Sequence, residues 1–328
     1  MRKTKTRQSI NVSEYEDILY YKLKNSRFKQ QRLPAWRPVP TLCAVIVFYN
    51  TFAIIFIVLG IILLVYSSKI IKLEIPYSKF EHCIIGKSCN IREEIKDKME
   101  PPIMVYYKLY GFYQNHRRYV RSKSIKQLYG EETTKEEMEN DGDCKPIYTN
   151  KDIGKNISLN NTELDPKDVA IPCGIIAKTY FNDTFSNWIL SGEKNEKIEV
   201  NTQNIAWEKD KLLFQNSNNI SKQWINMKDE HFIVWMRPAG LPNFMKLWGR
   251  IEKTTLNKRD NISFSVENNY NITGNKSIVL STTNEFGGKN TFLGVCFIVV
   301  GIISFILGIC FTFIINKNKK SDNLKKTV

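Results

Sequence analysis

Two long apolar runs stand out in an otherwise polar chain of 328 residues. Residues 41–66 and 291–315 contain no Asp, Glu, Lys or Arg, and as α-helices they would measure about 39 and 37 Å. The hydrocarbon core of a bilayer is roughly 30 Å thick, so each run can span it with some tilt. The first run begins too late and is too long for a cleavable signal peptide. We predict two transmembrane helices, at 41–66 and 291–315, and not a pair of buried core helices.

Between these runs, residues 67–290 alternate short apolar stretches with clusters of Asn, Asp, Gly and Pro, which is typical of strands joined by turns. We expect strands within Ile103–Tyr110, Lys197–Val200, His231–Met236, Ile262–Val266 and Ser277–Leu280. Phe112–Leu128 is compatible with a helix or an extended arm, and the acidic stretch Glu131–Asp143 with a solvated loop. The expected fold is therefore a large, mainly antiparallel, sandwich-like β domain with some helix, flanked by two transmembrane helices.

The first 40 residues precede the first span. Apolar side chains recur there at helical spacing at Tyr15, Ile18, Leu19 and Leu23. With Lys22 and Lys24 beside them, they favour a short amphipathic helix on an anionic membrane surface, with a disordered tail as the alternative. Pro34, Pro38 and Pro40 then exclude a continuous helix into the span. We interpret the stretch from Phe28 to Trp36 as a structured elbow.

The net charge of +15 is unevenly distributed. Residues 1–40 carry +7 and residues 316–328 carry +4, whereas the much longer segment 67–290 also carries only +4. Lys and Arg concentrate on the cytoplasmic flanks of membrane spans. Both termini are therefore expected in the cytoplasm, with 67–290 as one domain in the lumen or outside the cell.

The cysteines and glycosylation motifs agree with an oxidising compartment for this domain. It contains an even number of cysteines, at Cys83, Cys89, Cys144 and Cys173. Of the three possible pairings we favour Cys83 with Cys89 and Cys144 with Cys173; free thiols are the alternative. Candidate Asn-x-Ser/Thr acceptors in this segment are Asn156, Asn160, Asn182, Asn219, Asn261, Asn271 and Asn275.

Small residues form a stripe along the second apolar run, at Gly294, Gly301, Ser304, Gly308 and Thr312. Such stripes allow close approach of another helix in lipid. The first span, which carries Asn50 and Thr51, is one candidate partner, and another protein is the alternative.

Signatures of catalysis are lacking. The sequence has three histidines and no His-Glu-x-x-His, paired Cys-x-x-Cys or Gly-x-Ser-x-Gly motif, so we predict no catalytic residues, metal or cofactor. A basic group comprises Arg117, Arg118, Arg121, Lys123 and Lys126. Its expected lumenal location argues against nucleic acid as a ligand. We expect it to pair with Glu131, Glu132 and Glu136, or to contact an acidic loop of a partner or lipid headgroups.

Several motifs together resemble one family. They are the blocks Phe28–Trp36, Phe112–Val120, Pro172–Gly174, Phe181–Thr184, Trp235–Arg237 with Leu241, Pro242 and Phe244, and Gly287–Asn290. Their order and spacing from about residue 28 to 310 resemble the accessory β subunits of lipid-flipping type IV P-type ATPases, the cell-division-control and ligand-effect-modulator family. The chain departs from the family pattern at Glu208 after Trp207 and at Met245, and it lacks an extra lumenal cysteine pair common in animal relatives.

The resemblance implies a non-catalytic subunit that binds a catalytic α subunit, in a ratio near 1:1. It would escort that subunit from the endoplasmic reticulum and support transport of aminophospholipids to the cytoplasmic leaflet, there or in Golgi, endosomal or plasma membranes. A two-span channel or receptor subunit is the alternative. The expected partner contacts are Phe28, Lys29, Gln30, Gln31, Arg32, Pro34 and Trp36 in the cytoplasm, Gly294, Gly301 and Gly308 in the membrane, and Arg117, Arg118, Trp235, Arg237, Leu241, Pro242 and Phe244 in the lumen. The last group has an alternative role in holding the β core.

Overall fold

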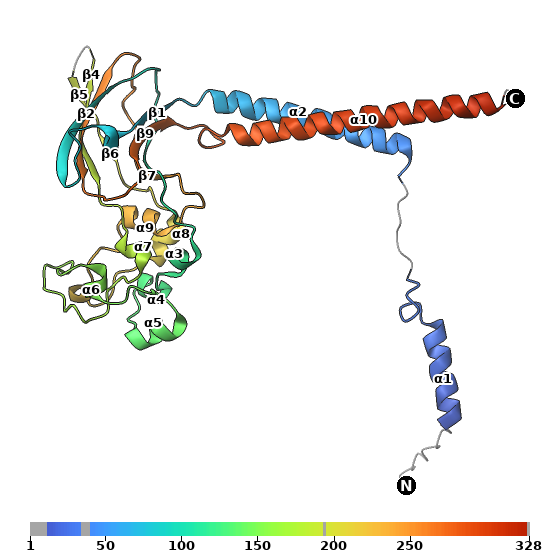
Figure 1. The fold of residues 1–328 in the computed structure, drawn as a ribbon, viewed down its shortest axis with the longest axis horizontal. Coiled ribbons are helices and arrows are strands. Elements are labelled where there is room, and N and C mark those ends of the chain that lie inside the picture. Colours follow the sequence, from blue (N-terminus) through green and yellow to red (C-terminus); the bar gives the residue numbers. More distant parts are fainter. Residues whose placement is uncertain (1–11, 34–39, 193–194, 327–328) are drawn as a thin grey trace, which may run out of the picture. The chain divides into compact units, whose positions relative to one another are not determined.

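The computed structural model describes residues 12–33, 40–192 and 195–326. The chain divides into two compact units, one formed by Val58–Ile298 and the other by Met1–Ile57 with Val299–Val328. The larger unit holds all the strands and the short helices between them, and the smaller holds most of the long terminal helices (Figure 1).

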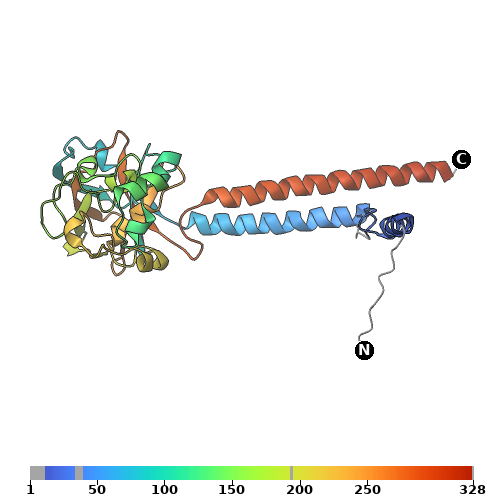
Figure 2. The same cartoon turned by 90° about the horizontal axis from the view of Figure 1, so that it is seen from below.

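The two predicted spans are present as helices α2 (Leu42–Ser68) and α10 (Thr291–Lys326). The 27-residue stretches Leu42–Ser68 and Thr291–Lys317 have mean hydropathies of 2.7 and 2.9, and both are long and apolar enough to cross a membrane. Helix α10 continues past the apolar run because residues 316–326 contain no Pro or Gly to end it. Both views show α2 and α10 side by side (Figures 1 and 2).

The segment before the first span contains helix α1 (Val12–Asn25), so the predicted helix is present there. A turn follows in which the Arg32 amide donates to the Arg27 carbonyl oxygen at 2.7 Å. Pro34 and Trp36, the end of the predicted elbow, lie outside the described residues.

Nine strands in the described chain form two antiparallel sheets, as predicted. One sheet has the order β1-β9-β3-β7-β6 and the other β2-β8-β4-β5. The strands are β1 (Lys72–Ile75), β2 (Lys87–Glu94), β3 (Ile103–Leu109), β4 (Thr184–Ser191), β5 (Asn195–Lys197), β6 (Val200–Asn201), β7 (Phe244–Ile251), β8 (Asn261–Asn268) and β9 (Lys276–Thr282). The predicted run 197–200 is a junction, since β5 ends and β6 begins there in different sheets.

The two sheets share one hydrophobic core. Alternate residues of β3, from Ile103 to Leu109, are buried, as the period of a strand requires. Aromatic rings fill the space between the sheets: Tyr107 stacks on Phe181 with ring centroids 3.9 Å apart, and Phe185 meets Trp248 edge-on at 5.0 Å. The described domain is thus a sandwich whose centre is aromatic.

A buried ion pair lies at the edge of this core. The Lys276 ammonium is 2.7 Å from Asp183 Oδ2, and both side chains are almost fully buried. Asp183 also accepts hydrogen bonds from the Tyr77 hydroxyl at 2.6 Å and from the backbone amides of Asn269 and Tyr270. The Asp183 carboxylate therefore joins its own segment to two others that are distant in sequence, at Tyr77 and at residues 269–276.

Short helices occupy the connections between strands. They are η1 (Tyr77–Lys79), α3 (Arg117–Arg121), α4 (Ile125–Leu128), α5 (Lys135–Asp141), α6 (Asn150–Ile153), α7 (Ile175–Lys178), α8 (Glu208–Leu213), η2 (Ile220–Lys222) and α9 (Glu230–Met236). Helix α9 packs on β7, and α7 contacts both α9 and α3 (Figure 1). The disulfide Cys144–Cys173 lies in a second small core among these helices.

Two local predictions were wrong. The run His231–Met236, expected as a strand, belongs to helix α9, because Asp229 caps it by accepting from the Phe232 amide at 3.3 Å. The stretch Glu131–Asp143, expected as a loop, contains helix α5. Thr134 and Glu137 form a reciprocal capping box at its start. The capping box satisfies two backbone amides at the helix start and so stabilises this short acidic helix.

Candidate partner-binding surface

Two segments about 125 residues apart in sequence lie side by side in the β domain. The Ala239 amide donates to Gln114 Oε1 at 2.9 Å, and Asn115 Nδ2 donates to the Gly240 carbonyl at 2.8 Å. The Phe112 amide donates to the Pro242 carbonyl at 3.0 Å. Residues 112–118 and 237–242 thus form a continuous surface, called here the two-segment surface. In the sequence, these blocks are separate motifs.

Aromatic rings of the core pack against the inner side of the two-segment surface. Phe112 lies 5.8 Å from Trp235 and 6.3 Å from Phe244, measured between ring centroids. Trp235 is fully buried, and its indole N–H donates to the Ile176 carbonyl at 2.8 Å. The sequence left two roles open for Trp235 and Phe244, a partner contact or a place in the β core, and burial places both side chains in the core. Large aromatic rings hold the loop in place here instead of contacting solvent.

The exposed part of the surface combines apolar and basic side chains. Leu241 is 70% exposed and Tyr113 is 63% exposed, while Pro242 is half-buried beside them. Arg117 and Arg118 are exposed on α3. Tyr113 belongs to the motif Phe112–Val120 but was not singled out from the sequence. The signal that could have identified it is a second aromatic residue directly after Phe112, which is half-buried against the core.

Arg237 connects the two-segment surface to helix α8. Its guanidinium forms a two-bond ion pair with Asp210 and lies 5.4 Å from the ring centroid of Trp207. Trp207, the N-cap residue of α8, is 68% exposed, and Leu212 within α8 is also exposed. In the sequence, Trp207 stands out only beside a departure from the family pattern, yet the structure adds it to the exposed apolar side chains of this region.

A buried lysine holds the backbone beneath Arg237. Lys246 Nζ donates to the carbonyls of Val234, Trp235 and Arg237 at 2.9, 2.8 and 2.6 Å, and so binds the carboxyl end of α9. Burial lowers the pKa of Lys246 to about 7. The three carbonyl acceptors match the three donors of an ammonium group, so we infer that the charged form is the one that fits this geometry.

The basic group pairs differently from the expectation. Lys126 is 3.0 Å from Asp141, but in the described part of the chain no carboxylate lies within 4 Å of Arg117, Arg118 or Arg121. Pairing with Glu131, Glu132 and Glu136 was therefore wrong for the described residues. Burial lowers the pKa of Lys123, while the nearby Asp210 carboxylate opposes that shift.

The glycine stripe of α10 is occupied by α2. A Cβ atom added at Gly294 would lie 2.8 Å from Leu64 Cγ, and one at Gly301 would lie 2.7 Å from Ile57 Cγ1. At Gly308 the nearest atom would be Asn50 Nδ2, at 2.8 Å. These glycines thus pack the two helices of this chain together, which is the first of the two predicted roles and leaves no room on this face for a second protein.

The expected cytoplasmic contact residues are only partly described. Phe28 is 74% exposed, and Lys29, Gln30, Gln31 and Arg32 are also exposed. An exposed Phe beside two basic side chains can bind a protein surface, and the turn at Arg32 fixes its backbone. Pro34 and Trp36 lie outside the described residues.

The cysteines pair as favoured from the sequence, with Cys83 bonded to Cys89 and Cys144 to Cys173. Candidate glycosylation asparagines are exposed at Asn156, Asn160, Asn182, Asn219, Asn271 and Asn275. Asn261 is half-buried at the start of β8. Among the described residues, no group of three or more His, Cys, Asp or Glu side chains is placed to hold a metal ion.

The chain is similar to a set of known proteins along nearly its whole length. The profile of the LEM3 (ligand-effect modulator 3) family / CDC50 family matches residues 63–321. ALA-interacting subunit 3 of Arabidopsis thaliana is 37% identical over 322 residues, covering 88% of this chain and 85% of the relative. Cell cycle control protein 50A of Mus musculus is 32% identical over 351 residues, covering 91% and 90%. Putative ALA-interacting subunit 2 of Arabidopsis thaliana is 35% identical over 329 residues, covering 90% and 88%. The match includes α2 from residue 63, the entire β domain and α10 as far as residue 321. The chain therefore belongs to the LEM3/CDC50 family, the accessory β subunits of type IV P-type ATPases.

Proposed function

We propose that this chain binds one catalytic α subunit of a phospholipid flippase, escorts it from the endoplasmic reticulum and supports its ATP-driven transport of aminophospholipids from the exoplasmic to the cytoplasmic leaflet. The observation that carries the proposal is the family match from residue 63 to residue 321, which includes the whole β domain. The relatives carry the names ALA-interacting subunit and cell cycle control protein 50A, and no catalytic motif is found in the sequence.

Charge and cysteine chemistry support the topology that this function needs. The tails 1–40 and 316–328 carry most of the positive charge, as cytoplasmic flanks do. Two disulfides favour an oxidising compartment for 67–290. With both termini in the cytoplasm, the β domain lies in the lumen of the endoplasmic reticulum, Golgi or endosomes, or outside the cell.

This topology would allow contact with the α subunit on both sides of the membrane. The Phe28–Arg32 segment, with Pro34 and Trp36, would bind in the cytoplasm, and the two-segment surface would bind in the lumen. The side chains at the lumenal contact are Tyr113, Arg117, Arg118, Arg237, Leu241 and Pro242. An accessory subunit supports a transport cycle only if it binds some states of the cycle more tightly than others. A disulfide-braced domain can do so because it keeps its own shape while the α subunit changes.

Affinity purification of the full chain in mild detergent tests the proposal. We expect it to recover a large P-type ATPase at a ratio near 1:1, and we expect that ATPase to remain in the endoplasmic reticulum when this chain is absent. Leu241→Asp should reduce recovery, because it places a charge in the apolar part of the two-segment surface. The matched control is Ile84→Asp, since Ile84 is an aliphatic residue of the same size that is 54% exposed in another loop. A homotrimer that conducts ions would contradict the proposal.

A further inference from the structure

A cavity of about 340 Å³ lies within the larger unit, where the chain passes between the ends of the long helices and the strands. We call it the membrane-side pocket. A volume of this size suits a small ligand group. Its polar lining comes from the connection after α2, from the connection between β2 and β3, and from the end of β9 with the two residues that follow it. The residues are Lys69, Lys98, Glu100, Thr282, Thr283 and Asn284.

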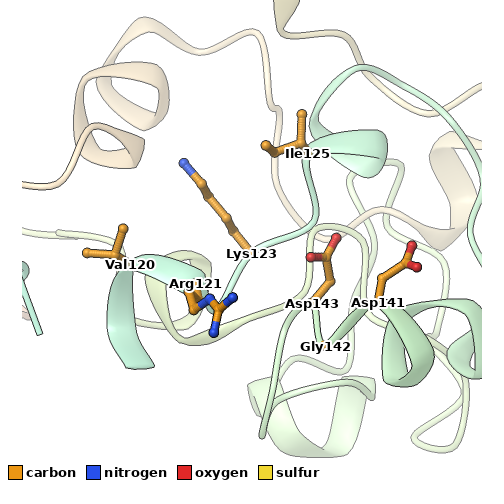
Figure 3. Close-up of a pocket in the computed structure, with 7 residues that line it drawn as sticks. All are labelled: Val120, Arg121, Lys123, Ile125, Asp141, Gly142 and Asp143. Carbon is orange, nitrogen blue, oxygen red and sulfur yellow. The ribbon is translucent and has the colours of Figure 1, made fainter. Parts of the chain in front are cut away.

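A different cavity shows what sets this pocket apart. That cavity, of about 290 Å³, has Arg121 and Lys123 on one side and Asp141 and Asp143 on the other (Figure 3). Its lining residues are far in sequence from both spans, and its acids offset its bases. The membrane-side pocket, in contrast, includes the residue directly after α2 and sets two lysines against one carboxylate.

The position of Lys69 places the pocket at the depth of lipid headgroups. Helix α2 spans the membrane, and it continues only two residues, about 3 Å, beyond Tyr66, where its charge-free run ends. Lys69 follows directly. The headgroup layer extends about 5–8 Å beyond the hydrocarbon core on each side of a bilayer. The Lys69 ammonium therefore lies in that layer, and the pocket opens beside it.

Hydrogen bonds between the two connections to the membrane hold the pocket in shape. The Ile71 amide donates to Thr282 Oγ1 at 3.0 Å, and the Thr282 amide donates to the Ile71 carbonyl at 3.0 Å. Asn284 Nδ2 donates to the Tyr66 carbonyl at 3.0 Å. Met99, which is fully buried, anchors the connection between β2 and β3. The pocket is thus preformed, which lowers the entropy cost of binding a ligand.

The charged groups of the pocket are available to a ligand. Lys69 is exposed, and within the residues that the structure describes no carboxylate lies within 4 Å of its ammonium. Lys98 pairs with Glu100 at 2.8 Å, but both side chains are more than half exposed. Such exposed pairs contribute little energy, so each partner can also pair with a ligand. The pocket therefore offers two ammonium groups and one carboxylate.

We propose that the membrane-side pocket binds the headgroup of a phospholipid that carries a primary amine next to its phosphate. The phosphate would lie between the ammonium groups of Lys69 and Lys98, and the amine would pair with Glu100. The acyl chains would remain in the hydrocarbon core and pass the exposed rings of Tyr66 and Phe286, whose centroids are 5.2 Å apart. Such rings are typical of the membrane interface.

The lipid would come from the leaflet on the side of the β domain, which is the exoplasmic leaflet in the topology proposed above. A free phosphate shares the anionic group but has neither amine nor acyl chains, so it would use only part of the pocket. The inference requires that α2 spans the bilayer, and it does not require a catalytic α subunit.

Photo-crosslinking in the full chain tests the pocket. A photoreactive amino acid replaces the half-buried Thr283, and the chain is reconstituted into phosphatidylcholine vesicles with a minor fraction of phosphatidylethanolamine. We expect the phospholipid adducts at position 283 to be enriched in phosphatidylethanolamine over the vesicle composition. K69Q/K98Q should lower the adduct yield about two- to tenfold, the loss expected from two exposed ion pairs. Glu100→Gln should return the adduct composition to that of the vesicles.

The control variant K96Q/K289Q removes the same charge close by. Lys96 lies in the same connection as Lys98, and Lys289 precedes a span as Lys69 follows one, yet neither lines the pocket and both are exposed. This variant should crosslink like the wild type. Equal losses in the two double variants would overturn the proposal, because any charge near the membrane would then suffice. Melting temperatures of all these variants should stay near that of the wild type, since the replaced lysines are exposed.

Two further results would also overturn the proposal. One is a wild-type chain that gives no phospholipid adduct, or adducts that match the vesicle composition. The other is displacement of the lipid by excess inorganic phosphate, which would identify a free phosphate as the ligand; we expect the adduct yield to be unchanged. None of these outcomes depends on recovery of a P-type ATPase, so the test is independent of the proposed function.

Discussion

The backbone amide of Ala239 donates a hydrogen bond of 2.9 Å to Oε1 of Gln114, a side chain 125 positions earlier in the chain. Gln114 is fully buried, and its Nε2 atom points to the Tyr119 hydroxyl at 3.4 Å. This one side chain therefore connects the segment that presents Tyr113 with the segment that presents Leu241. The two-segment surface depends on it.

Replacing Gln114 tests that dependence. Gln114→Leu keeps the approximate volume but leaves the Ala239 amide without an acceptor, which should lower the free energy of unfolding by about 1–3 kcal/mol. Chemical denaturation of the purified chain measures the loss. Asn115→Ala removes a hydrogen bond from a neighbouring exposed residue and should cost less. Equal losses for the two variants would show that burial of Gln114 is not what matters.

The Cys144–Cys173 disulfide joins residues 29 positions apart in sequence. In the chain-entropy model, its removal in C144S/C173S should cost about 3–4 kcal/mol, and removal of the shorter Cys83–Cys89 loop about 2.4 kcal/mol. Because the longer bond also lies in the second small core among the short helices, we expect C144S/C173S to retain the α subunit in the endoplasmic reticulum. Localisation of a tagged α subunit, compared with C83S/C89S, measures this. Normal export with C144S/C173S would count against the escort role.

Lys276 and Asp183 form the buried ion pair of the sandwich. Lys276→Met leaves the Asp183 carboxylate buried without a counter-charge and should destabilise the domain by about 3–5 kcal/mol. The double variant Asp183→Asn/Lys276→Met removes both charges and should recover part of that loss. Both substitutions keep the Asn-x-Ser/Thr motifs at Asn182 and Asn275. Thermal unfolding of the single and double variants measures the coupling between Asp183 and Lys276. A double variant less stable than Lys276→Met would contradict the expected recovery.

The buried environment of His231 predicts that the stability of the β domain depends on pH. Burial lowers its pKa below the ordinary value of 6.5, although Asp229 and Glu230 oppose this, and its Nε2 atom is buried without a hydrogen-bond partner beside Trp248. The unfolded chain then binds a proton that the folded chain does not, so stability falls as pH drops from above 6.5 toward the lowered pKa. Melting temperatures at pH 7.5 and 5.5 should therefore differ more for the wild type than for His231→Phe. Substitution of the exposed His82 by Phe should leave the difference unchanged.

The close packing of α2 against α10 should require a small residue at position 301. Gly301→Leu places a side chain against Ile57 and should separate α2 from α10 at that level. Cysteines replacing Tyr49 and Phe311, whose rings are 5.8 Å apart, report the separation by their disulfide yield once Cys43, Cys296 and Cys310 are changed to Ser. We expect a lower yield with Gly301→Leu and an unchanged yield with Val299→Leu, an exposed position on α10. Equal yields would show that the helices tolerate the larger residue.

Some of this architecture could be read directly from the order of residues. The two charge-free runs became α2 and α10 because a long apolar helix is encoded by local composition. Strand β3 was predicted because Ile103–Tyr110 is a short apolar run bounded by turn residues, and the structure shows the alternate burial of a strand there. Helix α9 was missed because its four buried residues, Phe232, Ile233, Trp235 and Met236, form a nearly continuous apolar run that is compatible with either a strand or a helix. The deciding feature was the cap at Asp229.

The sequence by itself determined the two apolar helices, the β class of the domain and, through the spacing of its motifs, the family. Only the tertiary structure decided which motif residues are exposed. Trp235 and Leu241 belong to one motif block, yet Trp235 is buried under Phe112 and Leu241 faces outward. Likewise, Arg121 and Lys145 line one cavity, where Ser122 joins α3 to the Cys144 loop. Exposure and proximity arise from contacts between segments distant in the chain, and local composition does not encode them.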